Sequence, residues 1–380
     1  MLTSNNKALG IIFPNSYDTF IPELVAERAM ASIPFASRYR MIDFVLSNMV
    51  NCGIDNISVI VRQNYHSLMD HLGAGREWDL TRKNGGLTIF PPYSERGIGS
   101  YQGRVDALAS ILNFLKDQKE KYIILTDANI ASKFDYEKMI KAHKKSGADV
   151  TIAYNEGEIA DRIKKASNPK KEQYYCFKVE GERIVDIEIN SKDDGVKNIS
   201  MNTYVMEREK LIEMITDANE RGGHRLERDI LIPQIKTLQI NGYKYDGYVA
   251  RITDMLTYFN ENMKLLEDDN LDALFDGNTI YTKIRDDNPT RYIAGASAKK
   301  SMVADGCVIE GTIENCVLFR GVKVGKGAVV KNCILMQDTV VEEGAQIENL
   351  ITDKRVTIGA GKSMKGETTY PYYIAKGQTV

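Results

Sequence analysis

Short apolar runs of strand length recur along the first two thirds of the chain. Up to about residue 264, these runs alternate with longer segments whose apolar residues have helical spacing. The runs at 56–61, 122–127 and 148–154 are rich in β-branched residues and end at turn residues or at helix-like segments. Runs of this kind are typical of central, mostly parallel strands. The alternation therefore predicts an α/β domain.

The intervening segments read as crossover helices. Residues 104–118 and 134–147 have the spacing of amphipathic helices. The second of these ends in basic residues followed by Gly147, as expected of a helix C-terminus. These helices are expected to cover the faces of the sheet.

After about residue 284 a short repeat replaces the helical spacing. Units such as CVIEG, VKVGKG and TVVEEG begin with a small or apolar residue and carry another apolar residue two places later. This is the pattern of a hexapeptide β-helix, whose coils stack their aliphatic side chains. We therefore expect an α/β domain at 1–264, a linker at 265–290 and a β-helix domain at 291–380. The predicted stack contains Val303, Ile309, Leu318, Val324, Val330, Leu335, Val341, Ile347 and Ile358.

The five cysteines are expected to be buried thiols. They include no CxxC pair, and their odd number argues against both a disulfide framework and a zinc site. Cys307, Cys316 and Cys333 open repeat units, where the side chain turns inward, so we predict packing roles for them. All four histidines precede the repeat, so the histidine base of hexapeptide-repeat acyltransferases is not expected.

The charge balance excludes several classes of partner. Fifty Lys and Arg residues against 52 Asp and Glu leave a formal net charge of −2, which favours neither nucleic acid nor a membrane surface. The N-terminal residues show no apolar core with a cleavage site, and nowhere do about 20 apolar residues run uninterrupted. We expect a cytoplasmic protein whose partner is a small molecule or another protein.

The most specific stretch is RAMASIPFASRYRMIDFVLSNMVNCGI at 28–54. It resembles the segment after the phosphate loop of bacterial ADP-glucose pyrophosphorylases, the glucose-1-phosphate adenylyltransferases that supply glycogen synthesis. GREWDL at 75–80, SYQGRVDAL at 100–108, LTDANI at 125–130 and HRLERDILIP at 224–233 support the resemblance, which covers nearly the whole chain. It implies a Rossmann-like nucleotidyltransferase domain with a mostly parallel sheet, a C-terminal left-handed parallel β-helix that helps to assemble subunits, and a tetramer.

In that family the phosphate of glucose 1-phosphate attacks the α-phosphorus of ATP and pyrophosphate leaves. The reaction needs a glycine-rich loop and cations on the triphosphate, carboxylates on Mg²⁺, and cations on the sugar phosphate. The family loop Gly-Gly-x-Gly-Thr-Arg corresponds to 14–20 here, which contains no glycine. Pro14 supplies no N–H, and Phe20 stands at the arginine position. Asp18 is expected to bring a negative charge toward the triphosphate.

The remaining binding groups are altered as well. The lysine of the family motif Arg-Ala-Lys-Pro is Met30 in this chain. The second metal-binding aspartate aligns with Arg251, although Asp254 could offer a carboxylate if the alignment is shifted. The lysine of the sugar-phosphate motif Glu-Lys-Pro aligns with Asn190, with Lys192 nearby. The resemblance thus implies a catalytic cleft that has lost most of its charged groups.

A framework of family residues is retained. The resemblance implies vestigial catalytic residues at Arg28 and Asp127, and Asp127 is also the vestigial metal ligand. The alternative for Asp127 is a satisfied carboxylate at a strand end. Arg40 and Asp43 have a structural alternative, a network that holds a helix against the sheet, and Trp78 is expected to be a packing anchor. We expect the nucleotide and sugar-phosphate cleft to contain Arg28, Arg38, Arg40, Tyr101, Gln102, Gly103, Asp106, Asp127 and Lys192.

These losses predict little or no turnover, because each lost phosphate-binding group typically costs a few kcal/mol of transition-state stabilisation. The pattern resembles the degenerate regulatory subunit that certain Gram-positive bacteria pair with a catalytic glucose-1-phosphate adenylyltransferase, which implies a heterotetramer. Two alternatives stay open. One is a weak adenylyltransferase that uses Asp127, Arg28 and Lys192 with Mg²⁺, and the other is a subunit that senses a sugar phosphate or nucleotide without chemistry.

Other expectations concern ligands and assembly. No intrinsic cofactor is expected, and Mg²⁺ is needed only if activity is retained. Self-association and small-molecule effectors are further candidate interactions of the chain. The basic loop at 164–173 is either a solvated loop or a binding site for an anionic effector.

Overall fold

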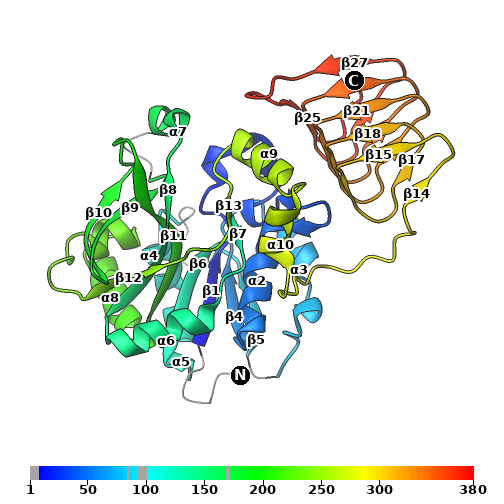
Figure 1. Cartoon of the computed structure of the whole chain (residues 1–380). Helices are drawn as coiled ribbons and strands as arrows, with labels where there is room; N and C mark the ends of the chain where they lie inside the picture. Colours follow the sequence, from blue (N-terminus) through cyan, green and yellow to red (C-terminus); the bar gives the residue numbers. More distant parts are fainter. Residues whose placement is uncertain (1–7, 84, 93–100, 168–171) are drawn as a thin grey trace.

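The computed structural model describes residues 8–83, 85–92, 101–167 and 172–380. An α/β domain forms the N-terminal part, and a parallel β-helix forms the C-terminal part (Figure 1). An extended segment connects them on one side of the molecule, while α9 (Met255–Lys264) lies on the side of the α/β domain that faces the β-helix (Figure 1).

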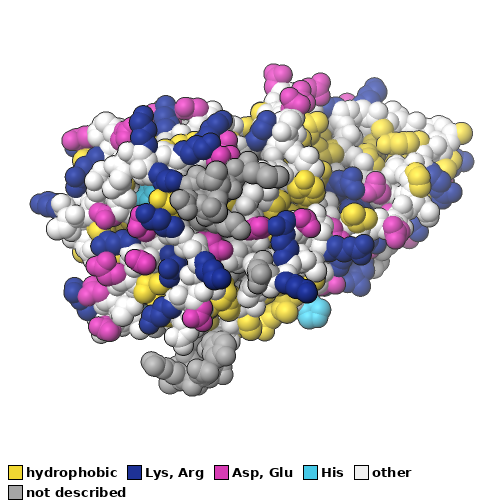
Figure 2. Space-filling model, turned by 90° about the horizontal axis from the view of Figure 1, so that it is seen from below, with side chains coloured by type: hydrophobic (Ala, Val, Ile, Leu, Met, Phe, Trp, Pro, Cys, Tyr) yellow, Lys and Arg dark blue, Asp and Glu magenta, His cyan; other side chains and the backbone are white. Residues whose placement is uncertain are grey.

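The surface is mixed in charge, in agreement with the near-zero net charge. Figure 2 shows Lys and Arg side chains interspersed with Asp and Glu side chains over the face seen there. Among the described residues, no helix is both long enough and apolar enough to cross a membrane.

The central sheet has the strand order β5-β4-β1-β6-β11-β8-β12-β10-β9. Its first four strands run parallel, as predicted, and they are β5 (Gly86–Phe90), β4 (Asn56–Ile60), β1 (Ala8–Phe13) and β6 (Tyr122–Asp127). Beyond β6 the directions mix, because β11 is antiparallel to both β6 and β8. The strands on this side are β8 (Val150–Glu158), β9 (Tyr175–Glu180), β10 (Arg183–Ile189), β11 (Val196–Glu207) and β12 (Ile240–Lys244).

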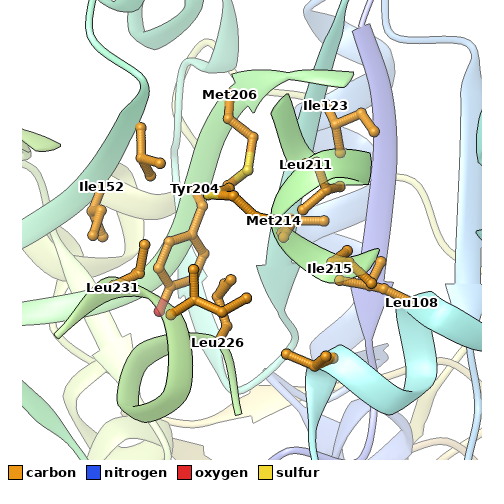
Figure 3. Close-up of a cluster of buried hydrophobic side chains, with 14 of the residues drawn as sticks. Leu108, Ile123, Ile152, Tyr204, Met206, Leu211, Met214, Ile215, Leu226 and Leu231 are labelled. Atoms are coloured by element: carbon orange, nitrogen blue, oxygen red, sulfur yellow. The ribbon is translucent and has the colours of Figure 1, made fainter. Parts of the chain in front are cut away.

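Helices cover both faces of this sheet. Alternate residues of β1 point to opposite faces, so Leu9 and Ile11 join one core cluster while Ile12 joins the other. Figure 3 shows the first cluster, in which Tyr204 of β11 packs beside Leu226. On this face lie α4 (Arg104–Ser110), α5 (Leu112–Asp117) and α8 (Arg208–Glu220). On the other face lie α2 (Met41–Asn51), α3 (His66–Leu72) and α6 (Tyr136–Ser146).

The two predicted helices differ in outcome. The segment at 134–147 forms α6 and ends at Gly147, which has a φ of 64° and caps the helix as predicted. The segment at 104–118 is not one helix, because the backbone of Ile111 leaves the helical region and separates α4 from α5. Trp78 is 2% exposed, which confirms its packing role.

The predicted β-helix is confirmed in the C-terminal segment, all of which the structure describes from residue 291 onward. Three parallel sheets form its faces. The first contains β14 (Arg291–Tyr292), β17 (Val308–Ile309), β20 (Lys323–Val324), β23 (Val340–Val341) and β26 (Thr357–Ile358). The second contains β15 (Ser297–Lys299), β18 (Thr312–Glu314), β21 (Val329–Lys331), β24 (Gln346–Glu348) and β27 (Ser363–Lys365). The third contains β16 (Met302–Val303), β19 (Val317–Leu318), β22 (Ile334–Leu335), β25 (Leu350–Thr352) and β28 (Tyr372–Ile374).

The aliphatic stack inside the β-helix follows the predicted repeat. Ile309, Val324, Val341 and Ile358 pair in register from coil to coil. The predicted positions join one buried cluster, with Val303 partly buried at its edge. The three cysteines of the repeat are free and fully buried in the same cluster, which confirms their packing role.

A third core cluster joins the two parts of the chain. Ile21 and Leu24, after the loop that follows β1, pack with Phe319 and Ile334 of the β-helix. Part of the segment at 265–290 is helical, since it contains α10 (Asp268–Phe275), and Leu274 belongs to this same cluster. The β-helix is therefore packed directly against the α/β domain.

A buried ion pair lies at this junction. Arg28 Nη2 donates to both carboxylate oxygens of Asp353, at 2.7 and 2.8 Å, and both side chains are 4% exposed. Tyr373 adds a hydrogen bond from its hydroxyl to Asp353 at 3.0 Å. Because Arg28 belongs to the α/β domain and Asp353 to the β-helix, this pair fixes one domain against the other.

We predict that Asp353→Asn lowers the free energy of unfolding by about 3–5 kcal/mol, because it leaves a buried guanidinium without its counter-charge. Urea unfolding followed by circular dichroism measures this change. Asp338→Asn is the matched control, because Asp338 is an exposed turn residue in the same β-helix. Equal stability of Asp353→Asn and the wild-type chain would contradict the role of the pair.

Candidate functional site

The cleft expected from the sequence lies at the carboxyl edge of the parallel strands. Phe13 at the end of β1 pairs in register with Asp127 at the end of β6. The loop at 14–20 leaves β1 at this point, so it begins beside the Asp127 carboxylate. A cavity of about 350 Å³ opens here, lined by residues that include Asn15, Ser16, Tyr17, Phe20, Tyr101, Gln102, Gly103, Arg104, Asp127, Arg225 and Glu227.

The loop is closed by its own side chains. Asn15 donates to Asp18 at 2.6 Å and to the Gln63 carbonyl at 3.0 Å, and its amide oxygen accepts from the backbone of Arg62 at 2.9 Å. Tyr17 is 5% exposed, and its hydroxyl accepts from the Asn202 amide. A phosphate-binding loop instead presents free backbone N–H groups to its ligand, so this loop is built for internal contacts.

The expectation that Asp18 faces the triphosphate is wrong. Its side chain is 6% exposed, is absent from the residues that line the cleft and accepts from the backbone N–H of Met30 at 2.8 Å. Burial raises the pKa of Asp18 to about 6, against the lowering effect of these hydrogen bonds. Asp18 therefore ties the loop to the segment around Met30. Met30 itself is 1% exposed in the core that joins the two domains.

Asp127 is already engaged by two protein donors. Ser16 Oγ donates to Asp127 Oδ1 at 2.6 Å, and Arg104 Nη2 donates to Asp127 Oδ2 at 2.6 Å. The Asp127 side chain is 1% exposed. This arrangement matches the alternative reading of Asp127 as a satisfied carboxylate at a strand end.

Arg104 joins a second carboxylate to the same cluster. Its Nη1 donates to Glu227, which lies in the helical turn Leu226–Leu231 and also accepts hydrogen bonds from the Tyr204 and Tyr175 hydroxyls. Burial alone would lower the pKa of Arg104, but the charges of Asp127 and Glu227 outweigh burial and raise that pKa well above its ordinary value. Arg104 is thus a permanent cation inside the cleft.

The position that aligns with the second metal-binding aspartate of the family carries no carboxylate in this chain. Arg251, at the end of β13 (Val249–Arg251), donates to the Ser200 carbonyl and to the Asn155 amide oxygen, both at 2.6 Å. Asp254, the shifted alternative, accepts from the backbone N–H of Thr257 at 2.7 Å and caps α9. Asp254 therefore serves as a helix cap.

The residues present do not fit a catalytic Mg²⁺ ion. Mg²⁺ is held by carboxylate oxygens and waters in octahedral geometry, whereas the cleft carboxylate here carries a guanidinium and a hydroxyl. Among the described residues, no three His, Cys, Asp or Glu side chains are grouped as metal ligands would be.

The expected sugar-phosphate residues occupy a turn. Asn190 has a φ of 53°, and its amide oxygen accepts from the backbone of Gln173 at 2.9 Å and Tyr174 at 3.3 Å. Lys192 is exposed and lines neither of the two cavities described in this section. In the basic loop at 164–173, residues 168–171 lie outside the described part of the chain, and Lys164 pairs with Asp194 at 2.6 Å.

The residues of the YQGRVDAL segment do meet in the cleft. Tyr101, Gln102 and Gly103 line it, as expected. Gly103 is needed for packing, because a Cβ on it would lie 2.0 Å from the His224 carbonyl oxygen. Asp106 lies just behind, with its Oδ1 2.7 Å from His224 Nδ1 and its Oδ2 accepting from the backbone of Gln102. This part of the motif holds the start of α4 against the turn that carries Glu227.

Arg28, Arg38 and Arg40 are not in this cleft, in contrast to our expectation. They line a second cavity of about 720 Å³ between the α/β domain and the β-helix. The reason is that the β-helix supplies partners that the linear motif does not reveal, namely Asp353 for Arg28 and Asp305 for Arg38. The sequence thus misplaced these three arginines.

The second cavity is strongly basic. Among the described residues that line it, nine are Lys or Arg and three are Asp or Glu. Two of these acids are already paired, Glu27 with Lys376 and Asp70 with Lys283. The basic residues are Arg28, Arg38, Arg40, Lys283, Arg285, Arg320, Lys354, Arg355 and Lys376.

Two of these cations are only partly compensated by their surroundings. Arg320 Nη1 donates to the Lys283 carbonyl at 3.2 Å, and Arg320 Nε lies 3.9 Å from the Asp305 carboxylate. Arg320 is 8% exposed, and its Nε and Nη2 have no hydrogen-bond partner among the described residues. Burial, followed by the nearby charges of Arg40 and Arg28, lowers the pKa of Lys354 to about 7. Both features indicate that a bound anion would stabilise this site.

Arg40 and Asp43 do take part in a hydrogen-bond network, but this network joins two helices and not a helix and the sheet as expected. Asp43 Oδ2 accepts from the backbone N–H of Arg40 at 2.9 Å, and Asp43 Oδ1 lies 2.5 Å from His71 Nε2. The Arg40 side chain donates to the Ser67 carbonyl at 2.7 Å. These contacts hold the start of α2 against α3.

Arg104 and Glu227 form the central ion pair of the cleft, and the sequence analysis missed both. Both lie in the quoted segments SYQGRVDAL and HRLERDILIP, but nothing in either segment indicates that they pair across 123 positions. The basic residues contributed by the β-helix were missed for the same reason.

Comparison with known proteins shows which family this sequence resembles. The nucleotidyl transferase family model matches residues 22–163, and the GlmU-like C-terminal hexapeptide model matches residues 285–368. Glycogen biosynthesis protein GlgD of Bacillus subtilis is 34% identical over 98% of this chain and 97% of its own length. GlgD of Geobacillus stearothermophilus is 35% identical over 86% of this chain and 83% of its own length.

Catalytic relatives are similar over almost as much of the chain. Glucose-1-phosphate adenylyltransferase of Geobacillus stearothermophilus is 31% identical over 85% of this chain and 83% of its own length. The chain therefore belongs to the glucose-1-phosphate adenylyltransferase family, to which it is joined by its likeness to both GlgD proteins and adenylyltransferases.

Proposed function

We propose that this chain is a regulatory, catalytically degenerate subunit of glucose-1-phosphate adenylyltransferase in glycogen biosynthesis. It assembles in the cytoplasm with a catalytic subunit, which converts ATP and glucose 1-phosphate to ADP-glucose and pyrophosphate, and the assembly is a heterotetramer. The observation that carries the proposal is a contrast between the two cavities. The buried carboxylates Asp127 and Glu227 of the catalytic cleft are paired with Arg104, whereas the cavity between the domains has an excess of basic groups that favours an anion.

The closed cleft argues against catalysis by this chain. Each element that a triphosphate needs is engaged by the protein itself: the loop by Asn15 and Tyr17, the strand-end carboxylate by Ser16 and Arg104. Transition-state stabilisation depends on donors and cations that point at the reacting phosphates. Groups already paired within the protein cannot supply it.

The cavity between the domains is the proposed effector site. Its volume of about 720 Å³ suits a metabolite, and its excess of Lys and Arg favours a phosphorylated one. The lining comes from both parts of the chain, with Arg40 from the α/β domain and Arg320 and Lys354 from the β-helix. An anion bound here would contact both domains. Effector binding would therefore act directly on the arrangement of the subunits.

The family relationship supports the proposed partner. The α/β domain and the β-helix keep the framework that catalytic relatives share over most of the chain. A subunit with a preserved framework and a closed cleft can assemble with an active relative. When such a subunit binds an effector that the relative binds differently, it shifts the conformational equilibrium of the catalytic subunit.

The first prediction concerns the assembled enzyme. When this chain is co-expressed with the catalytic glucose-1-phosphate adenylyltransferase of the same cell, with a tag on this chain only, the two should co-purify. ADP-glucose synthesis by the complex should respond to a sugar bisphosphate differently from synthesis by the catalytic subunit alone. Arg320→Gln should raise the effector concentration needed for that response by about 10- to 150-fold, because one charge-assisted contact contributes about 1.5–3 kcal/mol.

Lys362→Gln is the control for this experiment, because Lys362 is exposed in the same β-helix and does not line the cavity. Identical effector responses of the complex and of the catalytic subunit alone would refute the regulatory proposal. Turnover by this chain without a partner would instead favour the weak adenylyltransferase.

The second prediction concerns pH. Lys354 has a pKa of about 7, so it is mostly neutral at pH 8.5 and mostly charged at pH 6. Sulfate remains a dianion over this range, so its affinity for the cavity should rise as pH falls, by about tenfold if the gain of one charge contributes about 1.4 kcal/mol. Isothermal titration calorimetry at constant ionic strength measures this affinity.

Lys354→Met should remove most of this pH dependence. His66 and His71 also line the cavity, so a His66→Asn variant serves as the matched control and should retain the dependence. Sulfate affinity that is flat with pH in the wild-type chain would contradict the role of Lys354.

A further inference from the structure

We infer that Arg104 is a resident cation that fills the metal position of the catalytic cleft and excludes divalent ions from it. This inference rests on the proposed loss of catalysis and names the group that enforces it.

The first support is position. The Arg104 guanidinium lies between two carboxylates from different elements, with Nη2 on Asp127 at 2.6 Å and Nη1 on Glu227. Asp127 is the residue that the family resemblance assigns to the metal. A cation shared by two carboxylates is the arrangement that a divalent ion would otherwise create.

The second support is charge balance. Asp127 and Glu227 are 1% and 4% exposed at their side chains, so their negative charges are shielded from water. Buried carboxylates require an opposite charge and satisfied oxygens. Arg104 supplies the charge, and the hydroxyls of Ser16 and Tyr204 supply further donors. The carboxylates are therefore complete without a metal.

The third support is that Arg104 is held in place. Its guanidinium carbon lies 5.6 Å from the centre of the Phe13 ring and 5.5 Å from the centre of the Tyr204 ring, and its side chain is 13% exposed. Both contacts favour a cation. A divalent ion would have to displace this guanidinium or bind beside it against electrostatic repulsion.

The consequence is that removal of Arg104 should create a metal site. Arg104→Gln leaves two buried carboxylates facing each other without a counter-charge. We expect this variant of the full chain to melt at a lower temperature than wild type in metal-free buffer. Mn²⁺ should restore its Tm, whereas NaCl of equal ionic strength should not, because binding to the folded state alone stabilises it.

Mn²⁺ binding can be measured directly by the loss of the free Mn²⁺ signal in electron paramagnetic resonance. Arg104→Gln should bind Mn²⁺ at least tenfold more tightly than wild type, and the added substitution Asp127→Asn should abolish this binding. Arg104→Lys keeps the charge and should behave as wild type.

Arg225→Gln is the matched control, because Arg225 lines the same cavity but pairs with Glu172 at 3.0 Å. It should leave the Mn²⁺ response unchanged. Equal Mn²⁺ affinity of Arg104→Gln and wild type would overturn the inference. If Arg104→Gln does not fold, the wild-type chain and Arg104→Lys provide the test. Saturable Mn²⁺ binding to either protein that Asp127→Asn abolishes overturns the inference. The absence of such Mn²⁺ binding in both proteins upholds it.

The outcomes separate this inference from the proposed function. Turnover of ATP and glucose 1-phosphate by the wild-type chain alone would refute the proposed function, whatever the Mn²⁺ titration shows. Mn²⁺ bound at Asp127 of the wild-type chain without turnover would refute only the role of Arg104.

Discussion

Burial of a charge is costly unless the charge is paired and hydrogen-bonded, and this constraint organises both cavities of the chain. Arg28 meets Asp353 across the domain junction, and Arg104 meets Asp127 and Glu227 in the cleft. In both cases the partners come from different elements, so each pairing also fixes the elements relative to one another. The placement of the β-helix and the closure of the cleft thus have the same physical origin.

The same constraint leads to opposite results in the two places. In the cleft, the buried carboxylates of Asp127 and Glu227 are matched by Arg104, so a triphosphate or a metal finds few groups left to bind. Between the domains, positive groups outnumber negative ones, and two buried donors of Arg320 have no hydrogen-bond partner among the described residues. This contrast is the physical basis of our proposal that the chain binds an anionic effector in place of the reactants.

The sequence predicted the elements better than it predicted the contacts between them. The β-helix followed from its repeat, because stacked aliphatic positions recur at short, fixed spacing, as Ile309, Val324 and Val341 do. The strand at 122–127 was predicted to the residue because it is a short apolar run. The break at Ile111 was missed because the apolar spacing continues through it.

The candidate site was predicted only in part. Asp127, Tyr101, Gln102 and Gly103 do lie together, since strand ends and the following turns meet at one edge of the sheet. Arg28 was assigned to the wrong cavity because its partner lies 325 positions away in the β-helix. Pairings of this kind depend on tertiary structure, and local pattern carries no signal for them.

The most direct test of the account is the release of pyrophosphate from ATP, Mg²⁺ and glucose 1-phosphate by the purified chain, produced in a host that lacks the catalytic partner. The account predicts no release above background at any protein concentration. A rate that rises in proportion to the amount of this chain would contradict the account, because the cleft that contains Arg104 would then be catalytically active.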